Sequence, residues 1–189
     1  MQTLFSIEPI YPEGFQYTPD FVTAAEETIL LQEISKIELT TFQYQGYEAK
    51  RKTASFGFDY SFEKGKLVKG QTIPSSFNFI ITRIADFINV NPAEIAELLV
   101  IEYPVGSVIN WHRDAPPFDL IAGISLMSDC LFKLRPFDET LRSRKSTISI
   151  PVQRRSLYIM QGSSRSDWQH SIAPVTDIRY SITLRTLRK

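Results

Sequence analysis

Apolar residues in the first half of the chain recur at helical spacing in two stretches. The first stretch follows Thr23, a residue type favoured at helix N-caps, and has Glu26 and Glu27 in its first turn. Its apolar residues fall at helical intervals: Ile29, Leu30, Ile34 and Ile37. The pattern predicts a helix that begins just after Thr23.

The second helical stretch lies between Ser75 and Val90. Its apolar residues are Phe79, Ile80, Ile84, Ala85 and Ile88. Pro92 then ends this helix or begins a short one that continues to Leu98, because proline fits the first turn of a helix but not its interior. The first half therefore predicts two or three helices.

The remainder of the first half predicts extended or irregular backbone. The segment from Phe5 to Phe21 contains three prolines and a glycine, and predicts an irregular start with at most a short strand. Thr40 to Gly46 has extended character, and Ala54 to Tyr60 alternates as a strand does.

After Leu98 the chain changes to short β-type runs separated by turn residues. These runs are 100–103, 108–113, 120–127, 130–134, 146–151, 156–160 and 179–186. Short strands at this spacing are typical of a β-sandwich or barrel, and the helices that precede them make the fold class α+β.

Composition narrows the class of protein. With 189 residues, 43% apolar and 22% charged, the sequence predicts a single globular domain over residues 1–189, without repeat or linker. No signal peptide or membrane span is evident, so a cytoplasmic location without membrane contact is expected. The lone Cys130 excludes an internal disulfide.

The overall charge does not point to a polyanionic partner. Lys and Arg number 21, as do Asp and Glu, so the net charge is zero. Basic clusters occur at residues 50–52, 64–69, 142–145 and 154–155. They are either solvated surface or, if the fold brings them to one face, contacts for phosphates.

His112 and Asp114 form a candidate metal half-site. Residues two apart in a strand project to the same face, so both side chains can reach one ion while Trp111 and Arg113 face away. The third ligand must come from elsewhere, and His170 is the other histidine of the sequence. Two histidines and one carboxylate suit the iron(II) of oxygenases, although they also suit a hydrolytic zinc ion.

The C-terminal run adds a second constellation. Strand alternation places Arg179, Ser181, Thr183 and Arg185 on one face and Tyr180, Ile182 and Leu184 on the other. The two arginine Cα atoms would lie ~20 Å apart. Side chains that lean toward each other would leave room for a small dicarboxylic acid, with one guanidinium on each carboxylate. The alternative is an exposed edge with solvated arginines.

Together these residues resemble the AlkB-like family of iron(II)/2-oxoglutarate dioxygenases. The family pattern is His-x-Asp, a distal His and a C-terminal Arg-x-Asn-x-Thr-x-Arg, and it corresponds to the residues just described. The resemblance implies a double-stranded β-helix (jelly-roll) core with the predicted helices packed against it. It extends to Tyr103, implied to contact the cosubstrate, to residues 162–170 as the loop of the distal histidine, and to residues 56–60 as a substrate-facing strand.

The sequence departs from the family at three places. Ser181 replaces the usual Asn, and Ile101 occupies a position where an Asn often contacts the cosubstrate. The segment Ala115-Pro116-Pro117 follows Asp114, where the founding DNA-repair enzyme has an acidic pair that helps recognise the damaged base. The departures affect the expected substrate more than the expected metal site.

The resemblance implies iron(II), 2-oxoglutarate and dioxygen as cofactors, and oxidative demethylation of N-alkylated nucleobases in DNA or RNA. The base would be flipped or single-stranded, with Phe58, Tyr60 and Trp111 as candidates to line its pocket, unless they pack in the core. Two alternatives remain: the same oxygenase chemistry on a protein side chain or small molecule, and a non-catalytic jelly-roll that only binds. No obligate protein partner is evident.

Overall fold

The computed structural model describes residues 11–44, 47–61 and 64–189. Its helices are α1 (Ala24–Ile34), α2 (Asn78–Phe87) and α3 (Gly162–Ser166), with single 3₁₀ turns at 75–77, 92–94, 139–141 and 144–146. Its strands are β1 (Phe15–Thr18), β2 (Thr40–Tyr44), β3 (Tyr47–Ser61), β4 (Lys66–Lys69), β5 (Ile95–Tyr103), β6 (Ile109–His112), β7 (Phe118–Leu126), β8 (Cys130–Pro136), β9 (Ile148–Val152), β10 (Leu157–Met160), β11 (Trp168–Ile172) and β12 (Arg179–Leu187).

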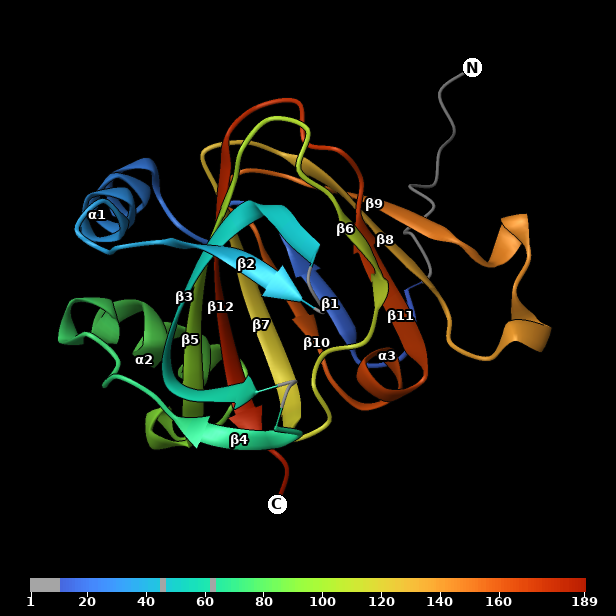
Figure 1. Cartoon of the computed structure of the whole chain (residues 1–189), viewed down its shortest axis with the longest axis horizontal. Coiled ribbons are helices and arrows are strands. Elements are labelled where there is room, and N and C mark those ends of the chain that lie inside the picture. The colour runs from blue at the N-terminus through green and yellow to red at the C-terminus, as the bar shows by residue number, and fades with distance from the viewer. Residues whose placement is uncertain (1–10, 45–46, 62–63) are drawn as a thin grey trace, which may run out of the picture.

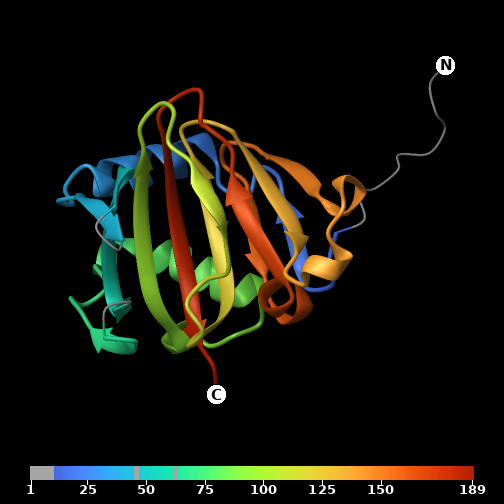
Figure 2. The same cartoon turned by 45° about the vertical axis from the view of Figure 1, so that its right-hand side comes forward.

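The described strands form two antiparallel sheets that face each other (Figures 1 and 2). The larger sheet has the order β1-β10-β7-β12-β5-β3-β2, with β4 paired to β3, and the smaller has the order β6-β11-β8-β9. Strands adjacent in space are mostly distant in sequence, as β12 between β7 and β5 illustrates. This is the double-stranded β-helix that the sequence predicts within an α+β fold.

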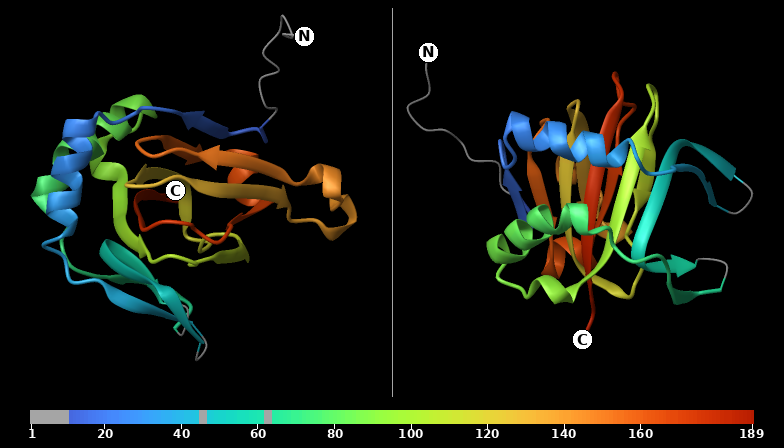
Figure 3. Two further views of the ribbon diagram at one scale, coloured as in Figure 1. Left: turned by 90° about the horizontal axis from the view of Figure 1, so that it is seen from above. Right: turned by 90° about the vertical axis from the view of Figure 1, so that its left-hand side faces the viewer.

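Two apolar cores hold the layers together. One lies between α1, α2 and the outer face of the larger sheet, and Figure 3 shows both helices on that side. It includes Leu30, Ile80, Leu98 and Ile182. The other core fills the space between the two sheets and includes Phe132. The larger sheet is therefore buried on both faces over much of its area, which explains its continuous apolar runs.

Strand β12 confirms the predicted alternation. Ile182 and Leu184 are buried in the core under the helices. The residues that alternate with them along β12 lie on the opposite face, and β12 pairs with β5 on one side and with β7 on the other. Arg179, Ser181 and Thr183 are all buried there, so β12 is a central strand and its arginines are not a solvated edge.

The predicted helices are largely confirmed. Thr23 caps α1 through a capping box with Glu26, as the sequence indicates. Ile29, however, is 47% exposed, because the buried stripe of α1 runs through Glu27, Leu30 and Ile34 instead. Helix α2 falls within the predicted stretch, although Phe79 is also largely exposed.

Other predicted elements need correction. A short helix from Pro92 to Leu98 is wrong: a single 3₁₀ turn ends at Glu94, and β5 begins at Ile95 because its residues pair with β12. The segment 162–170 is not simply a loop, since it contains α3 and the first half of β11. The predictions for residues 5–10 and 45–46 fall outside the described residues.

None of the helices within the described ranges combines the length and apolar character that crossing a membrane requires.

Candidate metal centre

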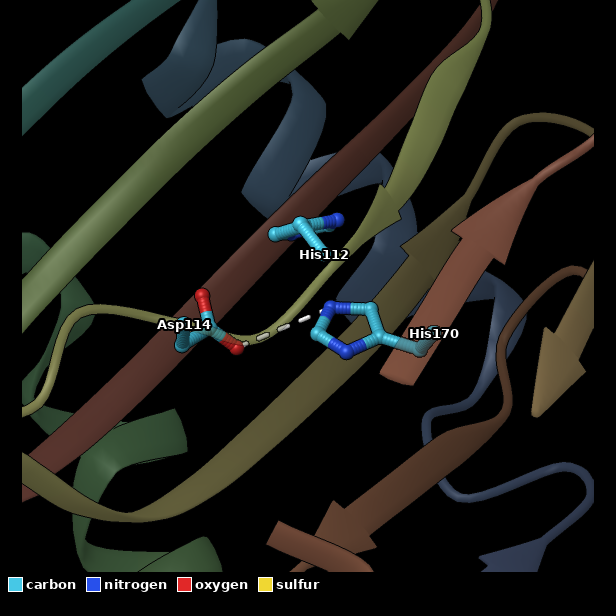
Figure 4. A group of neighbouring side chains, drawn as sticks. All are labelled: His112, Asp114 and His170. Atoms are coloured by element: carbon cyan, nitrogen blue, oxygen red, sulfur yellow. Dashed lines mark ion pairs between the residues drawn. The ribbon is translucent and has the colours of Figure 1, made fainter. Parts of the chain in front are cut away.

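Two strand residues and one residue that follows a strand bring their side chains together between the sheets. His112 is the last residue of β6, Asp114 follows in the turn, and His170 lies in the middle of β11 directly opposite His112. One potential ligand atom from each lies within 4.8 Å of the others. Figure 4 shows the carboxylate and both imidazoles converging on one space. The predicted grouping of these residues is therefore present in the fold.

The geometric reason for the grouping differs from the predicted one. Strand β6 ends at His112, so strand alternation does not orient Asp114. Instead, Arg165 of α3 donates from one guanidinium nitrogen to the backbone oxygens of Asp114 (3.2 Å), Ala115 (2.8 Å) and Phe118 (2.9 Å). This buried arginine fixes the turn that presents the Asp114 carboxylate.

Each imidazole can direct one ring nitrogen at a shared metal ion. Nδ1 of His112 lies 2.8 Å from the backbone oxygen of Asn110, which can only accept, so Nδ1 carries the proton and Nε2 is free for a metal. The His170 ring stacks on Phe132, with centroids 5.4 Å apart. Burial, followed by the neighbouring His112, lowers the pKa of His170 to about 3.

Asp114 keeps its negative charge through ion pairing. Burial alone would raise the pKa of its carboxyl group, but Arg185, whose Nη2 donates to it at 2.7 Å, holds that pKa well below its usual range. The His170 Nε2 atom lies 3.6 Å from the other carboxylate oxygen. The donor set is therefore two imidazoles and one carboxylate, which fits iron(II) with open positions for further ligands.

Arg185 has a different environment from the predicted one. Its Nη1 donates to Glu97 (2.6 Å) and its Nη2 to Asp114, so two protein carboxylates already occupy the terminal nitrogens. Glu97 lies on β5 directly opposite Arg185 and also accepts from Ser55 of β3 (2.8 Å). The prediction that Arg185 grips one carboxylate of a dicarboxylic acid does not fit this geometry, because Arg185 bonds to the candidate metal ligand Asp114 instead.

Arg179 retains the character expected of an anion-binding residue. It is fully buried, its Nε donates to Ser125 (2.9 Å), and its guanidinium carbon lies 4.7 Å from the centre of the Tyr103 ring. Among the described residues, no hydrogen-bond partner meets its Nη1 or Nη2. Two unpaired buried N–H groups on a cation are costly unless an anion meets them, so Arg179 fits one carboxylate of 2-oxoglutarate.

A cavity of 1670 Å³ leads to this centre. The three candidate ligands line it, as do Tyr103, Thr183, Arg185 and Tyr60 of the predicted set. Arg179 and Ser181 are not among its lining residues, although the Tyr103 hydroxyl lies 3.4 Å from the Ser181 hydroxyl. Phe58 does not line it, and Trp111 faces the outer side of the smaller sheet, where Arg135 stacks on it.

Tyr158 is a site residue that sequence reasoning missed. Its side chain lines the cavity from β10 and forms no hydrogen bond to a described residue. Burial, followed by the nearby Tyr103, raises the pKa of its hydroxyl. Tyr158 lies directly opposite Gly123 of β7, and Gly123 lies opposite Thr183 of β12. Glu97 and Arg165 were also missed, because nothing in their local sequence indicates their partners.

Comparison with known proteins identifies the family. The model of the 2OG-Fe(II) oxygenase superfamily matches residues 14–186. The mouse tRNA (carboxymethyluridine(34)-5-O)-methyltransferase ALKBH8 is 25% identical over 172 residues, which cover 86% of this chain and 24% of that protein. The Arabidopsis thaliana alkylated DNA repair protein ALKBH8 homolog is 26% identical over 180 residues, which cover 84% of this chain and 50% of that protein. The chain thus spans a quarter to a half of the length of these relatives.

Solved structures share the fold at low sequence identity. OsALKBH1 has a TM-score of 0.75 at 13% identity, covering 94% of this chain and 99% of that one. A Trichoplax adhaerens prolyl hydroxylase in complex with a hypoxia inducible factor peptide has a TM-score of 0.66 at 15% identity. The match covers 92% of this chain and 83% of that one. The chain belongs to the 2OG-Fe(II) oxygenase superfamily as an AlkB-like member, and its cofactors are iron(II), 2-oxoglutarate and dioxygen.

Proposed function

We propose that this chain is a dioxygenase that demethylates N-alkylated nucleobases in DNA or RNA. The observation that carries the proposal is the convergence of His112, Asp114 and His170 within 4.8 Å at the cavity. The proposed substrate draws on the printed names of similar proteins, which include an alkylated DNA repair protein and an alkB homolog 3.

The two imidazoles and the Asp114 carboxylate would hold iron(II). Bound there with 2-oxoglutarate and dioxygen, the iron would supply the oxidation that hydroxylates a methyl C–H bond, with succinate and carbon dioxide formed from 2-oxoglutarate. The protein's own contribution is to keep the His170 imidazole neutral, to keep Asp114 ionised and to orient the three side chains. Arg185 and Arg165 serve this purpose by fixing the side chain and the backbone of Asp114, respectively.

Arg179 is the proposed partner of the distal carboxylate of 2-oxoglutarate. The hydroxyls of Tyr103, Ser181 and Thr183 follow it along the same inner face of the sheet. Tyr158 adds a phenol from β10 that forms no hydrogen bond within the described part of the chain. These neutral donors lie between the guanidinium of Arg179 and the metal ligands, so they are suited to orient a dicarboxylate between the two.

The cavity leaves room for a substrate beside the cosubstrate. Its 1670 Å³ exceeds the roughly 300–1,000 Å³ of ordinary small-molecule sites. Tyr60 of β3 lines it, whereas Phe58 and Trp111 lie outside its lining. Hydroxylation of an N-methyl group would give an N-hydroxymethyl group, which loses formaldehyde and leaves the unmodified base.

The test is iron-dependent formation of succinate from 2-oxoglutarate by the purified protein, with ascorbate present. We expect the wild-type protein to form succinate and the variants His112→Ala and Asp114→Ala to form none. Tyr180→Phe, a substitution on the helix-covered face of the sheet, should retain the activity. Methylated single-stranded DNA, methylated RNA and methylated peptides, analysed by mass, then distinguish the substrates. A protein that forms no succinate with any of them is not the proposed dioxygenase, and demethylation of peptides alone refutes the nucleobase substrate.

A further inference from the structure

A cluster of cations covers the outer face of the smaller sheet and the connection from β8 to β9, which projects at the right of Figure 1. We call it the basic face. Lys133 and Arg135 alternate on β8 with the buried Leu134, Arg113 directly follows β6, and the connection from β8 to β9 carries Arg142, Arg144 and Lys145. The nearby acids are fewer: Asp138, Glu139 and Asp167. The chain has no net charge, so this concentration of positive charge is a local property of the fold.

At the centre of the basic face, two guanidinium groups are held close together. Nε of Arg135 (2.9 Å) and Nη2 of Arg142 (3.4 Å) both donate to the side-chain oxygen of Gln169. All three nitrogens of Arg142 also meet other protein acceptors, namely Glu139 and the backbone oxygens of Pro136 and Phe137, so Arg142 contributes mainly its charge. Arg135 has no ion-pair partner among the residues that the structure describes. Burial, followed by repulsion from Arg142, lowers the pKa of Arg135. Like charges held in this way are suited to an anion that bridges them.

Aromatic rings keep two of these guanidinium groups in place. The guanidinium carbon of Arg135 lies 4.4 Å from the centre of the Trp111 ring, and that of Arg113 lies 3.5 Å from the centre of Phe137. Arg113 also donates to the backbone oxygen of Ser166 (2.8 Å). Arginines that already stack on rings and form hydrogen bonds lose little further side-chain freedom when a ligand binds. They therefore bind an anion more favourably than mobile surface lysines do.

The basic face adjoins the cavity through β6. Trp111 of β6 lies against Arg135 on the outer face, whereas the next residue, His112, lines the cavity. Arg113 itself lines the cavity mouth while it stacks on Phe137. A ligand on the basic face is therefore adjacent to a substrate group that enters the cavity.

We propose that the basic face binds the phosphate backbone of a single-stranded nucleic acid, one base of which enters the cavity. The inference rests on the proposed function and names the surface that would hold its substrate. Arginine forks match phosphate geometry, and several of them in a row match the repeated phosphates of a strand. A single strand is favoured over a duplex because the base must leave its stack to reach a buried centre.

The experiment measures the binding of fluorescently labelled single-stranded DNA and RNA oligonucleotides to the full chain by anisotropy over a range of salt concentrations. We compare wild type with Arg135→Gln/Arg142→Gln and with Arg144→Gln/Lys145→Gln, whose side chains are exposed and have no packing role. Arg83→Gln/Lys189→Gln removes the same charge from surface ion pairs elsewhere and serves as the control.

We expect both basic-face variants to bind about tenfold more weakly, since each loses charged hydrogen bonds. The slope of log affinity against log salt should become shallower by about 1.4 for two lost contacts. The control should bind as wild type does, and His112→Ala should still bind the strand although it forms no succinate. Thus a failed dioxygenase assay leaves the binding result intact.

Three results would overturn the inference. One is an unchanged affinity and salt slope in both basic-face variants, with thermal unfolding showing that they are folded. Another is equal loss of affinity in the control, which would mean that the effect is one of total charge. The third is wild-type protein that binds neither oligonucleotide, or that prefers a duplex or an acidic peptide of equal charge.

Discussion

Asp114 owes its position to two arginines. Arg165 holds the backbone of its turn, and Arg185 holds its carboxylate while it also bonds to the buried Glu97. Burial raises the pKa of Glu97, and Arg185 opposes that shift. Arg185 is therefore the one residue that bonds to both buried carboxylates, according to the described contacts, and its loss would leave both without this partner.

Replacement of Arg185 by methionine tests this arrangement. The variant leaves Glu97 and Asp114 buried without their cation, so we expect a loss of about 3–5 kcal/mol in the free energy of unfolding. Affinity for Mn²⁺, a redox-inert substitute for iron(II), should also fall because Asp114 is no longer held. Urea unfolding and calorimetric titration measure the two effects.

The double variant Arg185→Met/Glu97→Gln separates stability from metal binding. It removes one of the two uncompensated charges, so part of the lost stability should return while Mn²⁺ binding stays weak. If Arg185→Met bound Mn²⁺ as tightly as wild type, Arg185 would not position the metal ligand.

At the scale of elements, the register of three neighbouring strands shapes the cosubstrate region. Tyr158 of β10, Gly123 of β7 and Thr183 of β12 lie side by side. A Cβ at Gly123 would approach the Tyr158 ring to 2.2 Å, so the absence of a side chain on β7 lets the phenol lie across that strand. The same register places Glu97 opposite Arg185 and Tyr103 opposite Arg179.

Gly123→Ala should therefore displace Tyr158. We expect overpacking to cost about 1–3 kcal/mol of stability, and 2-oxoglutarate to bind more weakly to the Mn²⁺-loaded protein. Tyr158→Phe keeps the ring over Gly123 and removes only the hydroxyl. It should retain stability and lower 2-oxoglutarate affinity about tenfold, as the loss of a hydrogen bond to a charged group would.

Tyr180→Phe is the matched control, because its hydroxyl bonds to Glu102 rather than facing the cavity. Calorimetric titration with 2-oxoglutarate measures all three variants. Equal affinity in Tyr158→Phe and wild type would remove Tyr158 from the proposed cosubstrate site.

For the whole molecule, the proposed ligands would join the two sheets. Two metal ligands come from β6 and β11 of the smaller sheet, whereas Arg179 and Tyr103 belong to the larger one. A metal and cosubstrate bound between them contact both layers of the fold. A ligand that binds only the folded state raises the free energy of unfolding, and the increase grows with the logarithm of the ligand concentration divided by its Kd.

We therefore expect Mn²⁺ and 2-oxoglutarate together, each at a hundred times its Kd, to raise the unfolding free energy by more than the ~2.7 kcal/mol of one such ligand. Thermal unfolding with each ligand alone and with both measures the effect, and a chelator should reverse it. His112→Ala should show no stabilisation by Mn²⁺; stabilisation equal to that of wild type would place the metal elsewhere.

Local patterns in the sequence predicted those features that depend on short-range periodicity. The alternation along 179–185 correctly predicted one polar and one apolar face, because side chains in any strand alternate regardless of its neighbours. Thr23 with Glu26 predicted the start of α1, because a capping box is also local and is complete within four residues. His112, Asp114 and His170 were identifiable because the chain has only two histidines.

Only the tertiary structure decided how these residues are used. Glu97 and Arg185 are 88 positions apart, and their pairing across β5 and β12 turned a predicted cosubstrate arginine into the partner of a metal ligand. Arg165 likewise meets the Asp114 turn from 51 positions away, and Trp111 faces outward toward Arg135. The sequence by itself determined which side chains share a face, because that depends on local backbone geometry. Which faces meet depends on the pairing of distant strands, and that is a property of the whole fold.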